Sequence, residues 1–451
     1  MDSTKEFETN SINYLSELVD LAKSSGADKA DGIAIYSSSL SVSQRLGKRE
    51  DLERAESENI GLRVFIGNKQ AIVSSTKHAI KKPKELVDSA ISMAKVTPED
   101  PFASLAEIDT IATSWPKLKL LDKYEPSPED LYSMSSEAEN AALSIDKITN
   151  SEGAEASWSK STVSLVTSEG FRGAYSGSSS ALSVSVIAGE DTNMERDYDY
   201  SISRFFSKLT SPKDLGVSAA NRTIKKLNPK KIKSTKMPII YDWRVASSIL
   251  NHFINAINGQ SVARKTSFLK EKLNQQVFSK DINIFDNPHI ISGLSSKPFD
   301  GEGSKNKLMQ LVSKGTLNSW ILDTSSAKQL NLKSTGHASR GIGSPPSPSP
   351  SNLYIDKGNH SVSELIDSVN ECLLVTELIG MGVNSVTGDY SRGASGFLIS
   401  KGEIIHPVNE ITIAGNLNEM FKNITPANDL QFRFGSNSPT LLVNGMTIAG
   451  T

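Results

Sequence analysis

The histidine residues are the first candidates for chemistry, because a neutral imidazole can act as a general base or as a zinc ligand. The chain has six of them, at positions 78, 252, 289, 337, 360 and 406. None lies within five residues of another, whereas a zinc site on one helix needs two donors about one turn apart. The motifs H-E-x-x-H, C-x-x-C and G-x-x-x-x-G-K-[ST] are absent. No local stretch therefore predicts a metal or phosphate site.

Five other residues could take part in chemistry, and each has an ordinary structural alternative. His337, between Gly and Ala, could be a base or a ligand, although a lone histidine more often hydrogen-bonds a carbonyl group. Asp389 and Arg392 in GDYSRG could clamp a charged peptide, or Asp389 could cap a turn. Glu377 and Glu410 are lone carboxylates, so the sequence predicts no acid/base pair from them.

Three glycine-rich segments stand out beside these residues. They are KPFDGEG (297–303), STGHASRG (334–341) and GMGVNSVTGDYSRGASGF (380–397). Glycine permits positive φ and a close approach of backbones, which could leave N–H and C=O groups free to pair with an extended peptide. The structural alternative, bulges and tight turns in a strongly curved sheet, is the one that the sequence alone favours.

The first half of the chain is predicted to be an antiparallel sheet with helices. Apolar residues alternate at 33–42, 62–66, 163–165 and 182–186, and Gly67-Asn68 turns the chain into QAIVSST, which indicates a hairpin. A first helix is expected from a cap at Asn10 or Ser11 to a stop at Gly26. Further helices are expected from Pro83 to before Pro98, after Pro128, and near 212–227.

The stretch 225–236, KKLNPKKIKSTK, has six lysines and is predicted to be a solvated linker rather than an anion-binding patch. It separates a predicted N-terminal α+β domain, 1–230, from a predicted β-rich, barrel-like C-terminal domain, 231–451. The second half opens with strand PIIYD and a helix over about 243–257. The Ser/Pro stretch 341–352 is expected to stay outside any sheet ladder. The broad apolar face of the 243–257 helix consists of Ala246, Ile249, Leu250, Phe253, Ile254 and Ile257.

The composition is that of a soluble globular protein of 451 residues, with 37% hydrophobic and 22% charged residues and a net charge of −2. This balance gives no reason to expect nucleic acid as a partner. No apolar run reaches the roughly 18 residues of a membrane span, and the polar, acidic N-terminus is unlike a signal peptide. The single cysteine, Cys372, lies in an apolar stretch and is predicted to be a buried core thiol. One thiol makes no intramolecular disulfide, which favours the cytoplasm.

Long, collinear segments resemble the TldD/PmbA family of bacterial metalloproteases, and within it the PmbA (TldE) branch. They include IGLRVFIGNKQAIVSST (60–76), MERDYDYSISR (194–204), SVARKTSFL (261–269) and VTELIGMGVNSVTGDYSRGASGF (375–397). The resemblance covers nearly the whole chain. It implies a TldD–TldE heterodimer that encloses a protected chamber and degrades or trims unfolded peptides.

The resemblance also implies that the TldD-like partner holds zinc through HExxxH on a helix and through a cysteine near its C-terminus. The matching helix here reads NHFINAINGQ, in which His252 remains but Phe253 and Ile257 replace the base and the second histidine. The cysteine stretch reads RFGSNSPTLL. Zinc-assisted hydrolysis needs a metal-bound water and a base to take its proton. We therefore predict no catalytic residue and no zinc in this chain, with zinc in the partner subunit.

Three hypotheses follow for the function. In the first, the chain is a non-catalytic subunit, active only with its TldD-like partner. The residues predicted to bind peptide or partner are then Asp389, Tyr390, Ser391, Arg392 and Gly393. In the second, it is a standalone peptide-binding or regulatory module that acts as a homodimer. In the third, it is an autonomous metalloenzyme with ligands from His252, His337 and His406.

Overall fold

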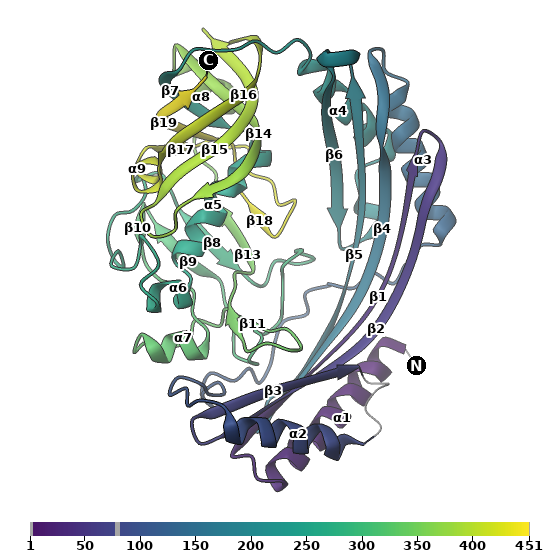
Figure 1. Ribbon diagram of the computed structural model, residues 1–451, viewed down its shortest axis with the longest axis vertical. Coiled ribbons are helices and arrows are strands. Elements are labelled where there is room, and N and C mark those ends of the chain that lie inside the picture. Colours follow the sequence, from purple (N-terminus) through teal and green to yellow (C-terminus); the bar gives the residue numbers. More distant parts are fainter. Residues whose placement is uncertain (1–2, 77–81, 451) are drawn as a thin grey trace.

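The computed structural model describes residues 3–76 and 82–450 (Figure 1). Its first half is built on one antiparallel six-stranded sheet with the order β3-β2-β1-β4-β5-β6. Several strands are much longer than usual, and together they curve into an arch (Figure 1). The strands are β1 (Lys29–Arg45), β2 (Lys48–Ile66), β3 (Lys69–Thr76), β4 (Ile148–Thr167), β5 (Arg172–Ala188) and β6 (Glu195–Ser203).

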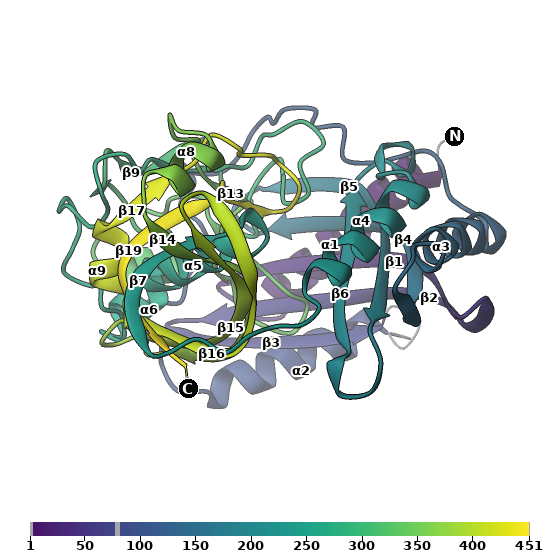
Figure 2. The same cartoon turned by 90° about the horizontal axis from the view of Figure 1, so that it is seen from above.

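Four helices cover this sheet. Helices α3 and α4 lie on the side that faces away from the second half of the chain (Figures 1 and 2). Helix α3 begins with a capping box between Ser127 and Asp130. The predicted hairpin and the last three helices are confirmed, but the first helix begins well before Asn10. The helices are α1 (Ser3–Ser24), α2 (Pro83–Val96), α3 (Pro128–Leu143) and α4 (Pro212–Lys225), with 3₁₀ turns at η2 (Asp191–Asn193) and η3 (Phe206–Lys208).

Alternation along β1 explains how one sheet serves several cores. Ala30 and Ala34 face α1 and α2, whereas Ile33 faces the other side and packs against Phe299 of the second half. Farther along the strand, Val42 packs under α3 and α4. Successive strand residues point to opposite faces, so β1 is buried on both.

The second half contains a closed five-stranded barrel, as the sequence predicted. Its strand order is β16-β15-β14-β7-β19, and β19 pairs again with β16 through Thr412 and Ala449. Helix α5 (Trp243–Ala256) packs its apolar face into the barrel core. The barrel strands are β7 (Thr235–Tyr241), β14 (Glu371–Val383), β15 (Asp389–Ser400), β16 (Glu403–Asn416) and β19 (Leu441–Ala449), and β17 (Ile424–Pro426) adds to β19.

A smaller sheet lies beneath the barrel in the view of Figure 1, and short helices flank the barrel and this sheet. The prediction that 341–352 avoids every ladder is wrong at two points. Pro348 pairs with Ala338 in a two-residue ladder, and Asn352 pairs with Asn287 at the start of a longer strand. The sheet order is β10 (Thr316–Leu317), β9 (Met309–Ser313), β8 (Ile284–Asn287), β13 (Asn352–Ile355) and β18 (Ser436–Asn437), with a separate pair β11 (Ala338–Ser339) and β12 (Ser347–Pro348). The helices are α6 (Gly259–Ala263), α7 (Thr324–Gln329), α8 (Val362–Asp367) and α9 (Leu417–Lys422).

The two halves meet through buried contacts of two kinds. Phe299 of the second half packs between Phe171 and Trp115, with ring centroids 4.8 and 4.9 Å away. Asp31 on β1 forms ion pairs with Arg63 on β2 and with Arg340, which follows β11. All three charged side chains are buried. The arch and the second half are thus joined by aromatic packing and by desolvated charge.

The connection between the halves runs from the end of α4 to the first strand of the barrel (Figure 1), and it is solvated only in part. Lys226 is only 7% exposed, the Lys230 N–H donates to Pro407 O at 2.9 Å, and Lys231 pairs with Glu410. The solvated-linker prediction is therefore wrong for Lys226, whereas Lys230 and Lys231 are exposed, as predicted. The division into domains 1–230 and 231–451 stays a prediction. Across residues 3–76 and 82–450, no helix has the length and apolar character needed to cross a bilayer.

Candidate functional site

The five residues predicted to bind peptide or partner begin strand β15, and their side chains alternate between its two faces. Tyr390 is 1% exposed and lies in the barrel core, where its hydroxyl is 3.4 Å from that of Tyr241. The Asp389 carboxylate accepts hydrogen bonds from Thr387 Oγ1 (2.6 Å) and Asn416 Nδ2 (3.0 Å), and these bonds lower its pKa. Asp389 is thus tied to its own turn.

Ser391, Arg392 and Gly393 continue the strand. Ser391 is exposed and Gly393 is half-buried. Of the five predicted residues, Arg392 is the one that lines a cavity next to α5. The predicted group is therefore split by the fold into a core residue, a turn residue and a cavity residue.

Helix α5 presents two very different faces. Its N-terminus is capped by Asp242, whose carboxylate accepts from the Arg244 N–H at 3.0 Å. Phe253 and Ile257 are fully buried, and the Phe253 ring meets Phe278 edge-on at 5.1 Å. Positions 253 and 257 therefore face the core, and the apolar face predicted for this helix is confirmed at both. The half-buried or exposed side chains on this helix are those of Trp243, Arg244, Val245, Ser247, Ser248, Asn251, His252 and Asn255.

A cavity of about 360 Å³ lies between this polar face and the arch. It is bounded by β6 and the end of α4 on one side and by α5, β14 and β15 on the other. Both halves of the chain therefore contribute to it. Its lining residues are Arg196, Asp197, Tyr198, Lys226, Arg244, Val245, Ser247, Ser248, Asn251, Thr376, Glu377, Leu378 and Arg392.

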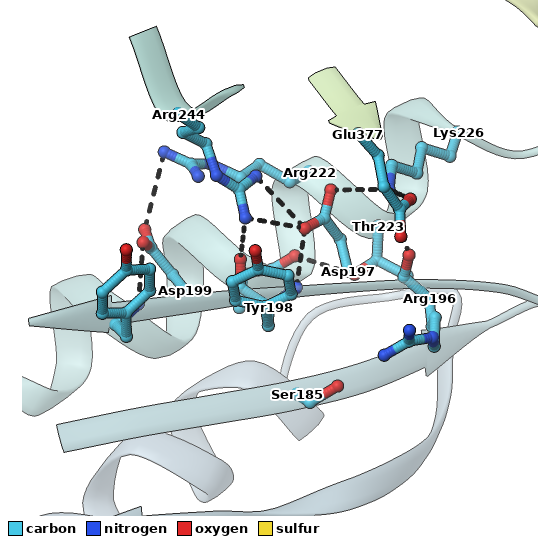
Figure 3. Close-up of polar contacts among 12 residues, drawn as sticks. Ser185, Arg196, Asp197, Tyr198, Asp199, Arg222, Thr223, Lys226, Arg244 and Glu377 are labelled. Atoms are coloured by element: carbon cyan, nitrogen blue, oxygen red, sulfur yellow. Dashed lines mark hydrogen bonds and ion pairs between the residues drawn. The ribbon is translucent and has the colours of Figure 1, made fainter. Parts of the chain in front are cut away.

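Asp197 is the centre of a buried charge cluster at this cavity (Figure 3). Its carboxylate lies 3.0 Å from Lys226 Nζ and 3.1 Å from the Arg244 guanidinium, and Lys226 also lies 2.9 Å from Glu377. Burial alone would raise the pKa of Asp197, but the two cations outweigh it and the pKa is lowered. The cluster joins β6, α4, α5 and β14. Glu377, predicted as a lone carboxylate, is paired here, and Glu410 is paired with Lys231.

Side chains also occupy the free edge of β6. Within the described chain, β6 pairs with β5 alone. The N–H groups of Tyr198 and Tyr200 donate to the preceding aspartates, Asp197 and Asp199, at 2.7 and 2.9 Å. The Tyr198 carbonyl accepts from Arg244 at 3.0 Å. Such satisfied edge groups protect a sheet edge from pairing with another strand, so this stretch offers little to an extended peptide backbone.

His252 sits on α5 beside the barrel strand β15. Its ring meets Tyr390 edge-on at 5.8 Å, and its buried Nε2 has no hydrogen-bond partner among the described residues. Burial, and then the charge of Arg392, lower the pKa of His252 to about 4. His252 is therefore neutral at physiological pH. The imidazole is thus packed against the barrel, while its Nε2 is unpaired among the described residues.

We expect His252→Leu to flatten the pH dependence of stability. The folded-state pKa of about 4 lies below the usual 6.5, so the unfolded chain binds more protons between these values and stability is lost as the pH falls. Between pH 7.5 and pH 4.5 the free energy of unfolding of the variant should therefore fall by roughly 2 kcal/mol less than that of the wild type, after a discount for the partial exposure of His252. Thermal unfolding at the two pH values measures this. The matched variant His360→Leu changes an exposed histidine, and its stability should depend on pH as that of the wild type does. If His252→Leu also showed the wild-type dependence on pH, the low pKa of His252 would be contradicted.

The remaining candidates lie apart from this cavity. His337 is buried, with Nδ1 2.8 Å from Thr335 Oγ1 and Nε2 3.2 Å from Asp286, and His406 Nδ1 lies 3.0 Å from Pro407 O. His78 is outside the described residues. Cys372 is a buried thiol, as predicted, and burial together with Glu371 raises its pKa to about 11. In residues 3–76 and 82–450, no three His, Cys, Asp or Glu side chains form a group that could hold a metal ion.

Comparisons with known proteins agree with this architecture along the whole chain. Three family profiles match in order: PmbA/TldA metallopeptidase domain 1 at 30–94, the central domain at 122–227 and the C-terminal domain at 234–450. Metalloprotease PmbA of Escherichia coli is 37% identical over 97% of this chain and 96% of its own length. A metalloprotease PmbA homolog of Haemophilus influenzae is 36% identical, with 96% and 94% covered.

Two solved structures share the fold. A putative modulator of DNA gyrase from Bacteroides thetaiotaomicron has a TM-score of 0.90 and 26% identity, and all of both chains is covered. TldE from Thermococcus kodakarensis has a TM-score of 0.86 and 19% identity, with 96% of this chain and 99% of that chain covered. With matching profiles over most of its length and relatives above one-third identity, the chain belongs to the PmbA/TldD metallopeptidase family, within its PmbA (TldE) branch.

Proposed function

We propose that this chain is the non-catalytic subunit of a heteromeric TldD–TldE metalloprotease that degrades or trims unfolded peptides. Family membership supports the protease context. The observation that carries the non-catalytic role is the polar face of α5, where Ser247, Ser248, Asn251 and Asn255 stand. Proteins hold catalytic zinc with imidazole, thiolate and carboxylate groups. The hydroxyl and amide groups on this face do not fit such a centre.

The core side of α5 is equally unsuited to the chemistry. A carboxylate at position 253 would be desolvated among Phe278 and Phe421, whose rings stack at 4.3 Å. An unpaired buried charge is strongly destabilising. His252, packed edge-on against Tyr390, is the one imidazole on the helix, and no carboxylate accompanies it there as a water-activating base. Zinc and base would come from a TldD-like partner, in the cytoplasm, where a chain with one buried thiol needs no oxidation.

The cavity between α5 and β6 is the proposed contribution of this chain to the peptide path. Its charged groups Asp197, Lys226, Arg244 and Glu377 neutralise one another. Arg392 contributes a further cation, whose Nε lies 3.5 Å from the Ile379 carbonyl. Because the β6 edge is already satisfied, a peptide would meet side chains here, with Arg392 opposite its carbonyl or carboxylate groups.

Replacing Arg392 by glutamine tests this role in the assembled protease. We expect the complex with the partner to form normally and to cleave an unfolded peptide about tenfold more slowly, because one charge-assisted hydrogen bond is lost. The readouts are cleavage rate and complex size by light scattering. The control is Arg49→Gln, an exposed arginine paired with Glu129 on the outer rim of the arch. Wild-type cleavage by the Arg392 variant would remove this residue from the peptide path.

A further inference from the structure

A second cavity, of about 210 Å³, lies at the opposite end of the seam from the α5 cavity. Strands β2 and β3 and the loop 100–104 form one wall, and α6, the loop before α7 and Pro345–Pro346 form the other. Like the α5 cavity, it is built by both halves of the chain. It contains none of the residues discussed for the proposed function.

Three buried polar atoms from residues lining this cavity have no hydrogen-bond partner in the part of the chain that the structure describes. They are Asp323 Oδ2, Gln70 Oε1 and Ser104 Oγ. Asp323 is fully buried, and its other oxygen, Oδ1, accepts from the N–H and the hydroxyl of Ser326. Two of the three atoms can only accept hydrogen bonds. Buried acceptors without donors are costly, so a ligand that brings donors would relieve them.

The charge of the cavity also favours a cation. Three carboxyl groups line it, from Glu302, Asp323 and Asp100, against two guanidinium groups, from Arg63 and Arg264. Arg63 is already committed to Asp31, with its Nε 3.0 Å from Oδ2, and Arg264 is exposed at the rim. The interior of the cavity therefore presents carboxyl and amide oxygens as its hydrogen-bond acceptors.

Glu302 is a buried carboxyl group of this cavity, close to two aspartates. Its Oε2 accepts hydrogen bonds from the N–H and the hydroxyl of Thr324, at 3.0 and 2.7 Å. Burial, then Asp300 and Asp323, raise the pKa of Glu302 to about 8. The carboxyl group thus holds a proton at neutral pH, because burial and the two aspartates outweigh the charge of Arg63.

We propose that this cavity binds a small organic cation, an ammonium or guanidinium group held by Asp323, Gln70 and Glu302. A metal ion is a poorer fit, since no group of three ligand side chains suited to a metal occurs in the described residues. An organic cation supplies several N–H donors at once, and the volume suits a butyl-sized molecule. The cation belongs either to a free amine or to a lysine or arginine side chain of a peptide.

Agmatine, which carries both cationic groups, is a suitable probe for calorimetry with the full chain at pH 7. We expect saturable binding, with no heat from the neutral analogue pentanol. Binding should release up to about one proton per ligand, because the cation lowers the pKa of Glu302. Titrations in two buffers with different ionisation enthalpies measure this release. In Glu302→Gln, which keeps an acceptor for Thr324, binding should weaken and the proton release should disappear.

Asp323→Asn is the sharpest variant, because asparagine also caps helices but replaces the free acceptor with a donor. We expect agmatine binding to weaken about 30-fold or more. Gln70→Leu changes a residue on the opposite wall of the cavity. It tests the site independently if Asp323→Asn also destabilises α7. The control Asp356→Asn changes a partly exposed aspartate that also accepts one backbone hydrogen bond, from Lys357 at 2.9 Å, and should bind as wild type does.

The source of the cation follows from one added titration. Tighter binding of the blocked peptide acetyl-Gly-Arg-Gly-amide than of agmatine would support a peptide side chain, and the reverse order would support a free amine. The proposal is overturned if neither compound binds below 10 mM, or if Asp323→Asn and Gln70→Leu both bind agmatine as wild type does. These outcomes leave the proposed protease role untouched, because the readout is binding by the chain alone.

Discussion

Replacing Asp31 by asparagine is expected to lower the free energy of unfolding by about 3–5 kcal/mol, the usual cost of breaking a buried ion pair. Asp31 is 1% exposed and is the shared counter-ion of Arg63 and Arg340. Without its charge, two guanidinium groups stay buried at the seam. The loss should appear as a lower midpoint of urea unfolding.

The pH dependence of the wild type gives an independent check on this pair. Burial would raise the pKa of Asp31, but Arg340 and Arg63 outweigh it and the pKa is lowered. A carboxyl group of this kind stabilises the fold above its ordinary pKa, and the contribution is lost as the pH falls towards the lower folded-state value. The free energy of unfolding of Asp31→Asn should lack this dependence on pH in the acid range.

The matched control for Asp31→Asn is Glu56→Gln. Glu56 pairs with Arg54 at 3.1 Å, but both side chains are largely exposed, at 53% and 71%. Exposed pairs contribute about 0–1 kcal/mol, so this variant should unfold close to the wild-type midpoint. Equal midpoints for Asp31→Asn and Glu56→Gln would show that the buried cluster does not hold the halves together.

Local signals were enough to predict much of the first half and the strands of the second. Gly67 turns the β2–β3 hairpin with φ of +56°, and Gly26 ends α1 with φ of +107°, both conformations that glycine adopts easily. Pro83 begins α2. The start of α1 was misplaced because Ser3 to Asn10 carry few apolar residues, and helix length there is set by capping and packing rather than by an apolar stripe.

Helix α5 shows what an apolar pattern can predict by itself. Phe253 and Ile257 belong to its predicted apolar face, and they also stand where the resemblance places the base and the second histidine of the metalloprotease motif. Both side chains are fully buried. The structure agrees with the apolar pattern, and the polar positions Asn251 and Asn255 are the ones that leave the core.

The charge clusters were beyond prediction because they depend on contacts between distant segments. Asp197 and Glu377 are separated by 180 residues in sequence, yet both meet Lys226. A signal did exist in the strands, where Asp31 and Arg63 each interrupt an apolar run. A charged residue at an inward position predicts a buried partner, but the sequence does not say which one.

The most direct test of the central claim is zinc content together with peptide cleavage, for the purified chain alone and for the chain mixed with a TldD-like partner. The partner is also assayed by itself. We expect the chain alone to be inactive and to keep far less than one zinc per molecule after dialysis, because α5 presents serine and asparagine rather than zinc ligands. The mixture should form one complex that cleaves an unfolded peptide and stops when a chelator is added. Chelator-sensitive cleavage by the chain alone, with one retained zinc per chain, would contradict the account, and so would a chain that stays a homodimer and leaves the partner's activity unchanged.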